Sequence, residues 1–365
     1  MSDQEFILAP PTVRVNFSLA PVRNHFNSLS LLNQTDDLLG FGGWVEQTYE
    51  DMSAERREQN VLVLYVLHDW DTKSGDTDFY DYINRVRGGD PMAARDALVN
   101  HYLQKVAEQD AQFDVTPEAV MQDVNLFVDL IEKAIGKHYE EKGKVLDLDM
   151  YARAFPLLQQ PEKALETTIE HLTFMWETYL KDDWERNLPM LTESMMAFRQ
   201  LDYRGQTATE TVRLVTGRDL AGYWDAMDNA NNITFIPSAH IGPYVTFHGA
   251  EGNDPTNYLV FGARVPEGVT KSPALSRSEV LVRLSALSDD TRLKILELMT
   301  QHEEVCAQDI IVWLNLSQSS ASRHLRQLTA TGYLTERRRE VAKCYTLNRD
   351  RIDDTLFALK HFLKM

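Results

Sequence analysis

The sequence predicts a mainly α-helical protein with a small amount of β-structure, and three observations lead to this fold class. Apolar residues recur at helical spacing through about two hundred residues of the N-terminal part. Short β-branched and aromatic segments, typical of strands, lie at residues 12–18 and between residues 233 and 264. Residues 276–365 change character again, with several short helices followed by a basic hairpin. We therefore predict a helical domain with a small antiparallel sheet, followed by a separate C-terminal domain.

The N-terminal part combines one early strand with long helical stripes. In TVRVNFS, residues 12–18, Val13, Val15 and Phe17 alternate with polar residues, which is a strand pattern. Two apolar stripes have helical spacing: Val120, Val124, Phe127, Val128, Ile131 and Ile135 in one, and Leu165, Ile169, Leu172, Trp176 and Tyr179 in the other. The strand-like segments ITFIP (233–237), YVTFHG (244–249) and NYLVFGAR (257–264) come later. Together with residues 12–18 they predict one antiparallel sheet that joins both ends of this domain.

Composition and charge indicate two domains of different character. The predicted division is a domain at residues 1–264, a linker at 265–275 and a domain at 276–365. From Pro273 onward there are 14 basic and 12 acidic residues, whereas the remainder holds 23 basic and 43 acidic residues. An acidic surface repels a nucleic-acid backbone, so any DNA contact is expected in the C-terminal part. Taken alone, the acidic balance is equally typical of an ordinary soluble domain.

Several features of the whole chain favour a cytoplasmic protein that does not enter a membrane. The N-terminus MSDQEFILAPP has neither a basic segment nor an apolar core, so no signal peptide is expected. The longest apolar run, VLVLYVL at residues 61–67, is far shorter than the ~18 residues needed to span a bilayer. The two cysteines, Cys306 and Cys344, are too few for a disulfide framework.

The C-terminal part reads as a fixed order of short elements. We predict helices at residues 276–287, 288–299, 307–314 and 318–332, two strands around a basic turn at 333–347, and a final helix at about 351–363. Ser288 or Asp289 is placed to cap the second helix, and Gly332 is a typical helix end. A helix, a short turn, a second helix and a basic hairpin make a winged helix-turn-helix, which is a DNA-binding arrangement.

The residue types in this part suit DNA recognition. The leading face of the predicted recognition helix carries Ser317, Gln318, Ser319, Ser320, Ser322, Arg323 and Arg326, and the wing carries Arg337, Arg338, Arg339 and Lys343. Small polar and basic residues fit a major groove, while wing cations can meet phosphates or the minor groove. Ala321, Leu325 and Leu328 supply the opposite, buried face. Each serine alone could instead be a cap and each arginine a solvated turn residue, but their combined order favours DNA binding.

The motifs ALSDDTRLKILELM, LSQSSASRHLRQLTATGYL and ERRREVAKCYTL resemble the ArsR/SmtB family of bacterial winged-helix repressors. The resemblance covers about the last ninety residues. It implies a homodimer in which helices at about 277–287 and 351–363 pair across the two-fold axis. It also implies binding to a palindromic double-stranded DNA operator, with release when an effector binds. The first 270 residues lie outside the resemblance, which departs from the family because its members are usually little more than this headpiece.

The metal-sensing members of this family carry Cys-x-Cys where this sequence has Cys306 and Gln308. A thiolate site needs two or three Cys or His ligands, and Gln is a poor substitute. Cys344 lies in the wing and is expected to pack against the sheet. A second family site uses carboxylate and His ligands on the last helix, where only Asp353, Asp354 and His361 occur, too widely spaced for one ligand shell. We therefore predict no metal and no cofactor, and interpret Cys306 as a small buried apolar residue.

The N-terminal domain is then the natural place for control by a small-molecule effector or by assembly. In SAHIGPYVTFH, residues 238–248, the candidates for a ligand-binding rim are His240, Tyr244 and His248, although a tight turn with partly exposed histidines is the favoured explanation of this stretch. Common nucleophile, phosphate-loop and zinc-protease motifs are absent from the sequence, so we expect no enzyme. Two alternatives stay open: a catalytic N-terminal domain with a DNA-binding tail, and a protein-interaction module.

Overall fold

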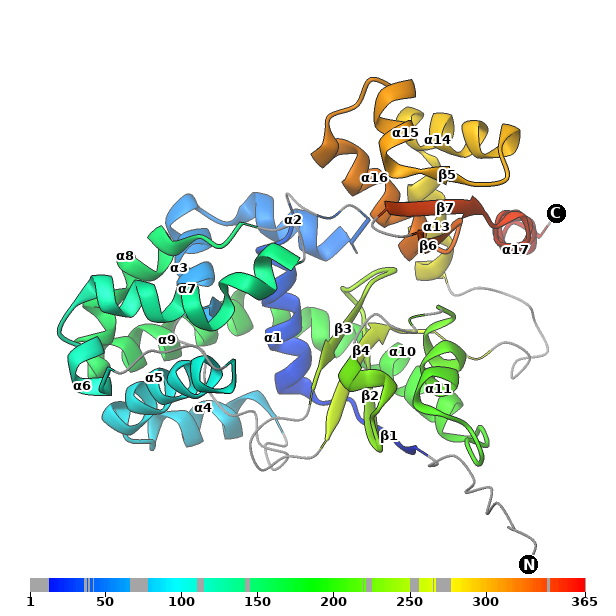
Figure 1. The fold of residues 1–365 in the computed structure, drawn as a ribbon. Helices are drawn as coiled ribbons and strands as arrows, with labels where there is room; N and C mark the ends of the chain where they lie inside the picture. Colours follow the sequence, from blue (N-terminus) through cyan, green and yellow to red (C-terminus); the bar gives the residue numbers. More distant parts are fainter. Residues whose placement is uncertain are drawn as a thin grey trace, which may run out of the picture. The chain divides into compact units, whose positions relative to one another are not determined.

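The computed structural model describes residues 13–35, 38, 40–41, 43–65, 78–109, 115–141, 145–218, 220, 225–249, 256–264, 266, 277–339 and 342–364. It divides into two compact units (Figure 1). A helical unit comprises residues 21–33 and 50–183. The other unit draws on residues up to 20, 34–49 and 184 onward, and contains both β-sheets. The predicted linker at 265–275 lies almost entirely outside the described residues, so the predicted domain division stays a prediction.

The helical unit is built from consecutive helices on the left of Figure 1. They are α1 (Pro21–Leu32), α3 (Ala54–Tyr65), α4 (Phe79–Arg87), α5 (Pro91–Glu108), α6 (Pro117–Val120), α7 (Val124–Glu141), α8 (Leu148–Leu158), α9 (Pro161–Met175) and the π-helical turn η1 (Trp176–Leu180), while α2 (Gly43–Asp51) spans the unit boundary. Phe127, Ile131 and Leu172 are fully buried, which confirms the cores of both predicted stripes. The described helices include none long and apolar enough to cross a membrane.

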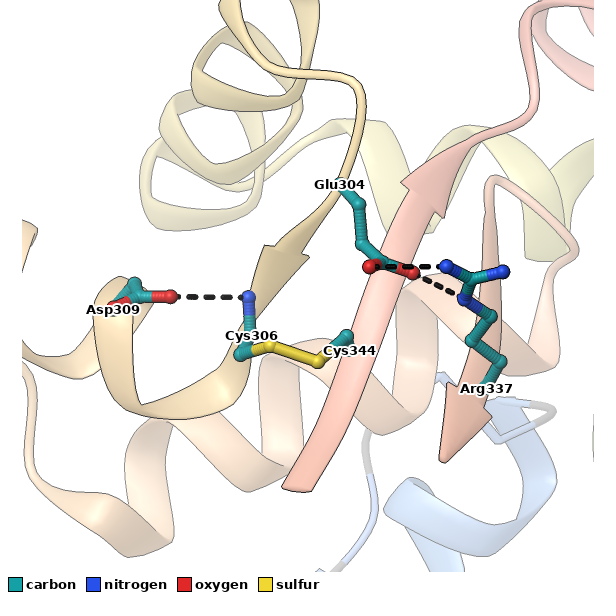
Figure 2. Close-up of a disulfide and its surroundings, with 5 residues drawn as sticks. All are labelled: Glu304, Cys306, Asp309, Arg337 and Cys344. Atoms are coloured by element: carbon teal, nitrogen blue, oxygen red, sulfur yellow. Dashed lines mark hydrogen bonds and ion pairs between the residues drawn. A yellow bond between two sulfur atoms is a disulfide. The ribbon is translucent and has the colours of Figure 1, made fainter. Parts of the chain in front are cut away.

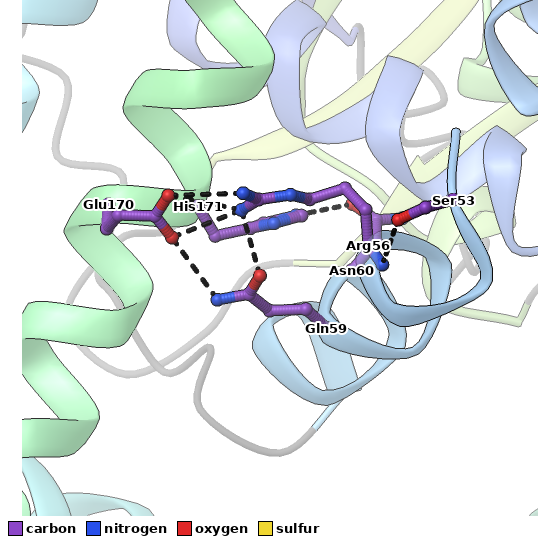
Figure 3. Close-up of polar contacts among 6 residues, drawn as sticks. All are labelled: Ser53, Arg56, Gln59, Asn60, Glu170 and His171. Carbon is purple, nitrogen blue, oxygen red and sulfur yellow. Dashed lines mark hydrogen bonds and ion pairs between the residues drawn. The ribbon is translucent and has the colours of Figure 1, made fainter. Parts of the chain in front are cut away.

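A hydrogen-bonded polar network ties three of these helices together (Figure 3). Asn60 on α3 is completely buried and donates to the Leu29 carbonyl of α1 at 3.0 Å and to Asn33 Oδ1 at 2.8 Å. Its own Oδ1 lies 3.0 Å from Nε2 of the buried His171 on α9. At the rim, Arg56 pairs with Glu170 at 3.1 Å, and this contact lowers the pKa of the Glu170 carboxyl. The network therefore specifies how α1, α3 and α9 pack.

A second buried polar residue of this unit, His25 on α1, lies among aromatic rings. Its ring centroid is 4.8 Å from Phe79 and 5.7 Å from Trp176, and those two rings stack on each other. Neither ring nitrogen of His25 has a hydrogen-bond partner among the described residues. Burial lowers the pKa of His25 to about 3, with His171 as a second cause, and burial lowers the pKa of His171 to about 4. Both imidazoles are therefore neutral at pH 7.

The four-stranded sheet has the order β1 (Arg14–Phe17), β2 (Asn232–Ser238), β4 (Asn257–Gly262), β3 (Val245–His248). The strands are found where the sequence predicts them, but the expected antiparallel sheet is a mixed one. Only β3 and β4 pair antiparallel, whereas β1 pairs parallel with β2 and β2 with β4. The reason is the connection along the chain. After β2 the chain forms β3, which lies at the edge of the sheet, and then reverses to form β4, which therefore runs in the same direction as its neighbour β2. Strand composition carries no information about this direction.

Helices α10 (Lys181–Arg199), α11 (Ala208–Thr216) and α12 (Asp225–Asp228) belong with this sheet, and the core between them is aromatic. Phe17 of β1 stacks on Phe198 of α10 and on Phe235 of β2. Arg199 donates to the Phe17 carbonyl at 2.5 Å, which anchors the edge strand to the helix. The alternating strand at the N-terminus thus buries Phe17 as its pattern predicts.

The C-terminal residues form the predicted winged helix-turn-helix. Its elements are α13 (Arg277–Leu287), α14 (Asp290–Gln301), β5 (Val305–Cys306), α15 (Ala307–Trp313), α16 (Gln318–Ala330), β6 (Leu334–Arg339), β7 (Ala342–Leu347) and α17 (Arg349–Phe362). The three strands form one sheet in the order β5-β7-β6. The buried Tyr333 hydroxyl lies 3.0 Å from the Arg283 carbonyl of α13 and 3.1 Å from the Thr355 hydroxyl of α17. These contacts hold the first and last helices of the domain to its core.

Candidate nucleic-acid interface

The recognition helix α16 begins with a side-chain cap. Ser317 is the N-cap residue, and its hydroxyl accepts from the backbone N–H of Ser320 at 3.1 Å. The same oxygen lies 3.1 Å from the Ser319 hydroxyl. Asn315, in the turn before the helix, has a φ of 51°, a left-handed conformation that Asn tolerates well. Ser317 therefore shapes the start of α16, which is the role of a cap.

The two faces of α16 divide as the sequence predicts. Ala321, Leu325 and Leu328 are at most 2% exposed and pack into the core of the domain. Gln318, Ser319, Ser322 and Arg323 are exposed, while Ser320 and Arg326 are half-buried. The first turn of the helix holds no acidic residue. One side of α16 thus offers hydroxyl, amide and guanidinium groups to solvent, the groups that read base edges and phosphates.

A buried polar contact behind this face was not indicated by the sequence. Asp289 caps α14 by accepting from the Arg292 backbone N–H at 2.9 Å, which settles the choice between Ser288 and Asp289. His324 of α16 places its Nδ1 3.5 Å from Asp289 Oδ1. Arg292 is buried and donates to the Ala286 carbonyl at 2.7 Å. These contacts connect the recognition helix to α14 and to the end of α13, so they fix its angle in the domain.

Two of the wing cations, Lys343 and Arg337, lie beside acidic partners. Lys343 Nζ of β7 lies 2.9 Å from Glu336 of β6. Arg337 of β6 is exposed and forms a two-pronged ion pair with Glu304, in which Nη2 donates to Oε2 at 3.2 Å (Figure 2). Arg338 and Arg339 occupy the next two positions of β6, opposite Lys343 and Ala342, and their side chains lie outside the description. Glu304 was not singled out by the sequence, because its partner is 33 residues away.

The two cysteines are bonded to each other, which corrects the interpretation of both. Cys306 is not an isolated apolar residue: it is half-buried, and its sulfur forms a disulfide with Cys344. Cys344 is fully buried in the sheet and nevertheless reaches Cys306. The cause is the register of β5 and β7, which places the two residues directly opposite each other (Figure 2). The sequence could not show this, because the cysteines are 38 residues apart and β5 is only two residues long.

No cluster of three His, Cys, Asp or Glu residues suited to a metal ion occurs in the described part of the chain. Gln308 follows Cys306 within α15, and Asp353 and Asp354 are exposed on α17. The side chain of His361 lies outside the description. Of the two ligand sets considered from the sequence, the one on the last helix includes His361 and so lies partly outside the described residues.

The three candidates for a ligand-binding rim differ in how far their side chains are exposed to solvent. His240 is buried and stacks on Trp44 with 4.2 Å between ring centroids. Tyr244 is buried and packs against Phe41 at 5.4 Å, whereas His248 at the end of β3 is exposed. His240 and Tyr244 thus take part in ring packing, and the ligand-binding rim stays a prediction.

A capped recognition helix with a basic wing behind it defines a winged helix-turn-helix domain. Residues 289–336 match the family model described as "Bacterial regulatory protein, arsR family". The chain is 33% identical over 82 residues to the arsenical resistance operon repressor of Staphylococcus aureus, which covers 22% of this chain and 78% of that protein. It is 40% identical over 63 residues to the arsenic resistance transcriptional regulator ArsR2 of Pseudomonas putida, covering 17% and 55%.

The chain belongs to the ArsR family through its C-terminal domain. The chain spans about half the length of the Pseudomonas putida relative. The matched residues do not include the four-stranded sheet or the helical unit. The family resemblance of the last ninety residues is thereby confirmed.

Proposed function

We propose that the chain is a DNA-binding transcriptional repressor that binds a palindromic operator as a homodimer. The observation that carries the proposal is the exposed face of α16, where Gln318, Ser322 and Arg323 stand opposite the buried Leu325 and Leu328. A helix capped at its start and packed on one side presents such groups in a fixed geometry, as major-groove recognition requires. Its relatives are repressors and regulators by name, which supports the same function. The proposal implies a cytoplasmic protein.

The homodimer is supported by apolar side chains on the first and last helices of the winged-helix domain. Exposed large hydrophobic residues on or just after these helices are Leu281, Leu356, Phe357, Phe362 and Leu363. Exposed apolar groups gathered on two neighbouring helices are typical of an interface. Light scattering should give twice the chain mass, and Phe357→Glu should give the monomer. Leu214→Glu, an exposed leucine on α11, is the matched control and should leave the dimer intact.

We propose that control comes from the N-terminal part, through a small-molecule effector or through assembly, and we assign the chain no catalytic role. No contact among the described residues favours the two alternatives, a catalytic N-terminal domain or a protein-interaction module. The names of the relatives refer to arsenic, but the sensing pair differs in this chain. Gln308 offers no thiolate, so the Cys-x-Cys pair of the metal-sensing members is absent. An effector other than an arsenical is therefore favoured.

Fluorescence anisotropy with a labelled DNA fragment from upstream of the protein's own gene tests this function. Unrelated DNA of equal length is the control, and salt concentration is held constant because phosphate contacts make affinity salt-dependent. We expect binding that is at least ~10³-fold tighter to the upstream fragment, as for specific DNA-binding proteins. Equal binding to both fragments contradicts a repressor that reads sequence. The same assay then serves to screen effectors.

A further inference from the structure

The disulfide joins the wing of the winged-helix domain to the helix that supports the recognition helix. Cys306 is the residue directly before α15, and its backbone N–H donates to Asp309 Oδ2 in the first turn of that helix at 3.3 Å. Cys344 lies in the middle of the wing strand β7. The bond therefore connects the start of the helix that supports α16 to the wing (Figure 2).

The non-covalent link between these parts is short. Strand β5 has two residues, and its register with β7 consists of Val305 opposite Tyr345 and Cys306 opposite Cys344. One of these two pairs is the disulfide itself. Cleaving it leaves the Val305–Tyr345 pair and the backbone hydrogen bonds of a two-residue strand. A ladder this short gives little independent stability, and the remaining non-covalent link is the packing of Val305 and Tyr345 in the buried core of the domain. The disulfide adds a covalent restraint to this connection.

The wing cations lie immediately around the bond. Arg337 of β6 stands opposite Cys344 in the register of β6 and β7, and Lys343 is the neighbour of Cys344 in sequence. Arg337 also reaches Glu304, two residues before Cys306, so the ion pair connects β6, across the middle strand β7, to the segment that leads into β5. Any shift of β7 relative to β5 moves both cations, and with them the phosphate contacts proposed above.

We propose that Cys306 and Cys344 form a reversible thiol–disulfide pair that sets the DNA affinity of the protein, with the oxidised form binding more tightly. This rests on the proposed function. A protein bound to bacterial DNA works in a reducing compartment, where disulfides are rare and those that form are mostly transient or redox-sensing. The reason for the direction is pre-organisation: the bond holds wing and helix in one arrangement before DNA arrives, which reduces the ordering cost of binding.

The oxidation balances with a hydroperoxide as oxidant. The thiolate of Cys306, the more exposed of the two residues, attacks the peroxide oxygen; the O–O bond breaks, and a sulfenic acid and an alcohol or water form. The Cys344 thiol then attacks the Cys306 sulfur, the S–O bond breaks and water leaves. In total two thiols and one hydroperoxide give the disulfide, one alcohol or water, and one water. A dithiol supplies the two electrons and two protons for the return.

The test compares the full chain after treatment with hydrogen peroxide and after treatment with dithiothreitol. Anisotropy is measured for both forms against the upstream fragment and the unrelated fragment, with the reagents removed. Alkylation in denaturant, followed by mass measurement, counts the thiols in each form independently of DNA and exposes the buried Cys344 to the reagent. We expect no reactive thiol after peroxide treatment and two after dithiothreitol treatment. The oxidised form should bind the upstream fragment about tenfold more tightly than the reduced form, within the usual range of coupling between two sites. Cys306→Ala, at the half-buried position, should bind equally after either treatment and resemble the reduced form.

Each other outcome overturns the proposal in a recognisable way. Equal affinity of the oxidised and reduced wild-type protein for the upstream fragment overturns redox control while leaving the repressor function intact. Tighter binding of the reduced form overturns the pre-organisation argument. Two reactive thiols after peroxide treatment show that the pair is not oxidised by this class of reagent. Binding without preference for the upstream fragment in both forms contradicts the proposed function itself, and with it the control of that function.

Discussion

The helical unit and the winged-helix domain use their polar residues in opposite ways. In the winged-helix domain, Gln318, Ser322 and Arg323 face solvent, and the inner face of the same helix is apolar. In the helical unit, Asn60 and His171 are buried at the centre and bonded to each other (Figure 3). A polar group facing solvent is available to a partner, whereas a buried one must be satisfied inside the fold. The exposed polar groups of the winged-helix domain therefore suit binding, whereas the buried polar groups of the helical unit determine how its helices pack.

The largest expected effect concerns the buried histidines. In the unfolded chain their pKa is about 6.5, whereas His25 and His171 have pKa values of about 3 and about 4 in the fold. Below pH 6.5 the unfolded state therefore binds more protons than the folded state. The free energy of unfolding decreases as the pH is lowered, until the pH reaches the pKa values of the folded state. Between pH 7 and pH 5 this amounts to about 2 kcal/mol for each histidine. Urea unfolding followed by tryptophan fluorescence at the two pH values measures the loss.

A variant pair sharpens this measurement. His25→Phe should remove about half of the loss between pH 7 and pH 5, because a phenyl ring fits the aromatic surroundings and takes up no proton. His101→Gln removes an imidazole from α5 and is the control, with a loss like that of the wild type. An unchanged pH dependence in His25→Phe would show that this imidazole is not held neutral by burial.

The second effect tests the covalent link of the winged-helix domain. The disulfide closes a loop between residues 38 positions apart, so reducing it should destabilise this domain by roughly 3 to 4 kcal/mol through the entropy of the unfolded chain. Hydrogen exchange of peptides from residues 277–339, with and without dithiothreitol, measures the change. Peptides from residues 145–183 of the helical unit should exchange alike in both conditions. Faster exchange in both regions would contradict a local role for the bond.

The third effect concerns the exposed face of α16. Arg323→Ala should weaken binding to the upstream fragment by about 2 kcal/mol, or roughly thirtyfold, because a guanidinium that contacts a base edge is lost. Arg204→Ala removes the same charge from an exposed arginine paired with Asp202, far along the chain from this helix, and is the matched control. Equal affinity of the Arg323→Ala and wild-type proteins would show that α16 is not the recognition helix.

The smallest expected effect concerns the wing. Arg338→Ala should weaken binding to both DNA fragments about equally and lower the slope of log affinity against log salt by about 0.9, the value for one phosphate contact. Arg337→Ala should have a smaller effect, since Glu304 already offsets the charge of Arg337. DNA-binding titrations of both variants at four salt concentrations distinguish the effect of Arg338→Ala from that of Arg337→Ala. A loss confined to the upstream fragment would mean that Arg338 reads bases.

Local patterns predicted two apolar stripes of the helical unit and the elements of the winged-helix domain other than the short strand β5. The stripes containing Phe127, Ile131 and Leu172 are buried, and α16 begins and ends beside the predicted Ser317 and Gly332. Gly332 has a φ of 82°, a conformation in which glycine ends a helix without strain. These features depend on residues within one or two turns of each other, so a single sequence contains the information.

Contacts between distant residues were the ones missed. The antiparallel sheet was wrong for β1, β2 and β4, since pairing direction is set by how the connections run and not by strand composition. The interpretation of Cys306 was wrong because its partner is brought close only by β5 and β7. The Asp289–His324 contact and the Arg337–Glu304 ion pair also join residues more than thirty positions apart.

By itself, the sequence determined two apolar stripes of the helical unit, the helices and the hairpin of the winged-helix domain, its family and the face of α16 that is exposed. These follow from periodicity and capping, which act over a few residues. Only the tertiary structure decided the direction of the strands, the bond between Cys306 and Cys344, and the neutral state of His25 and His171. The physical reason is that register, burial and the distance between two sulfurs are properties of the packed chain, and local residue patterns do not encode them.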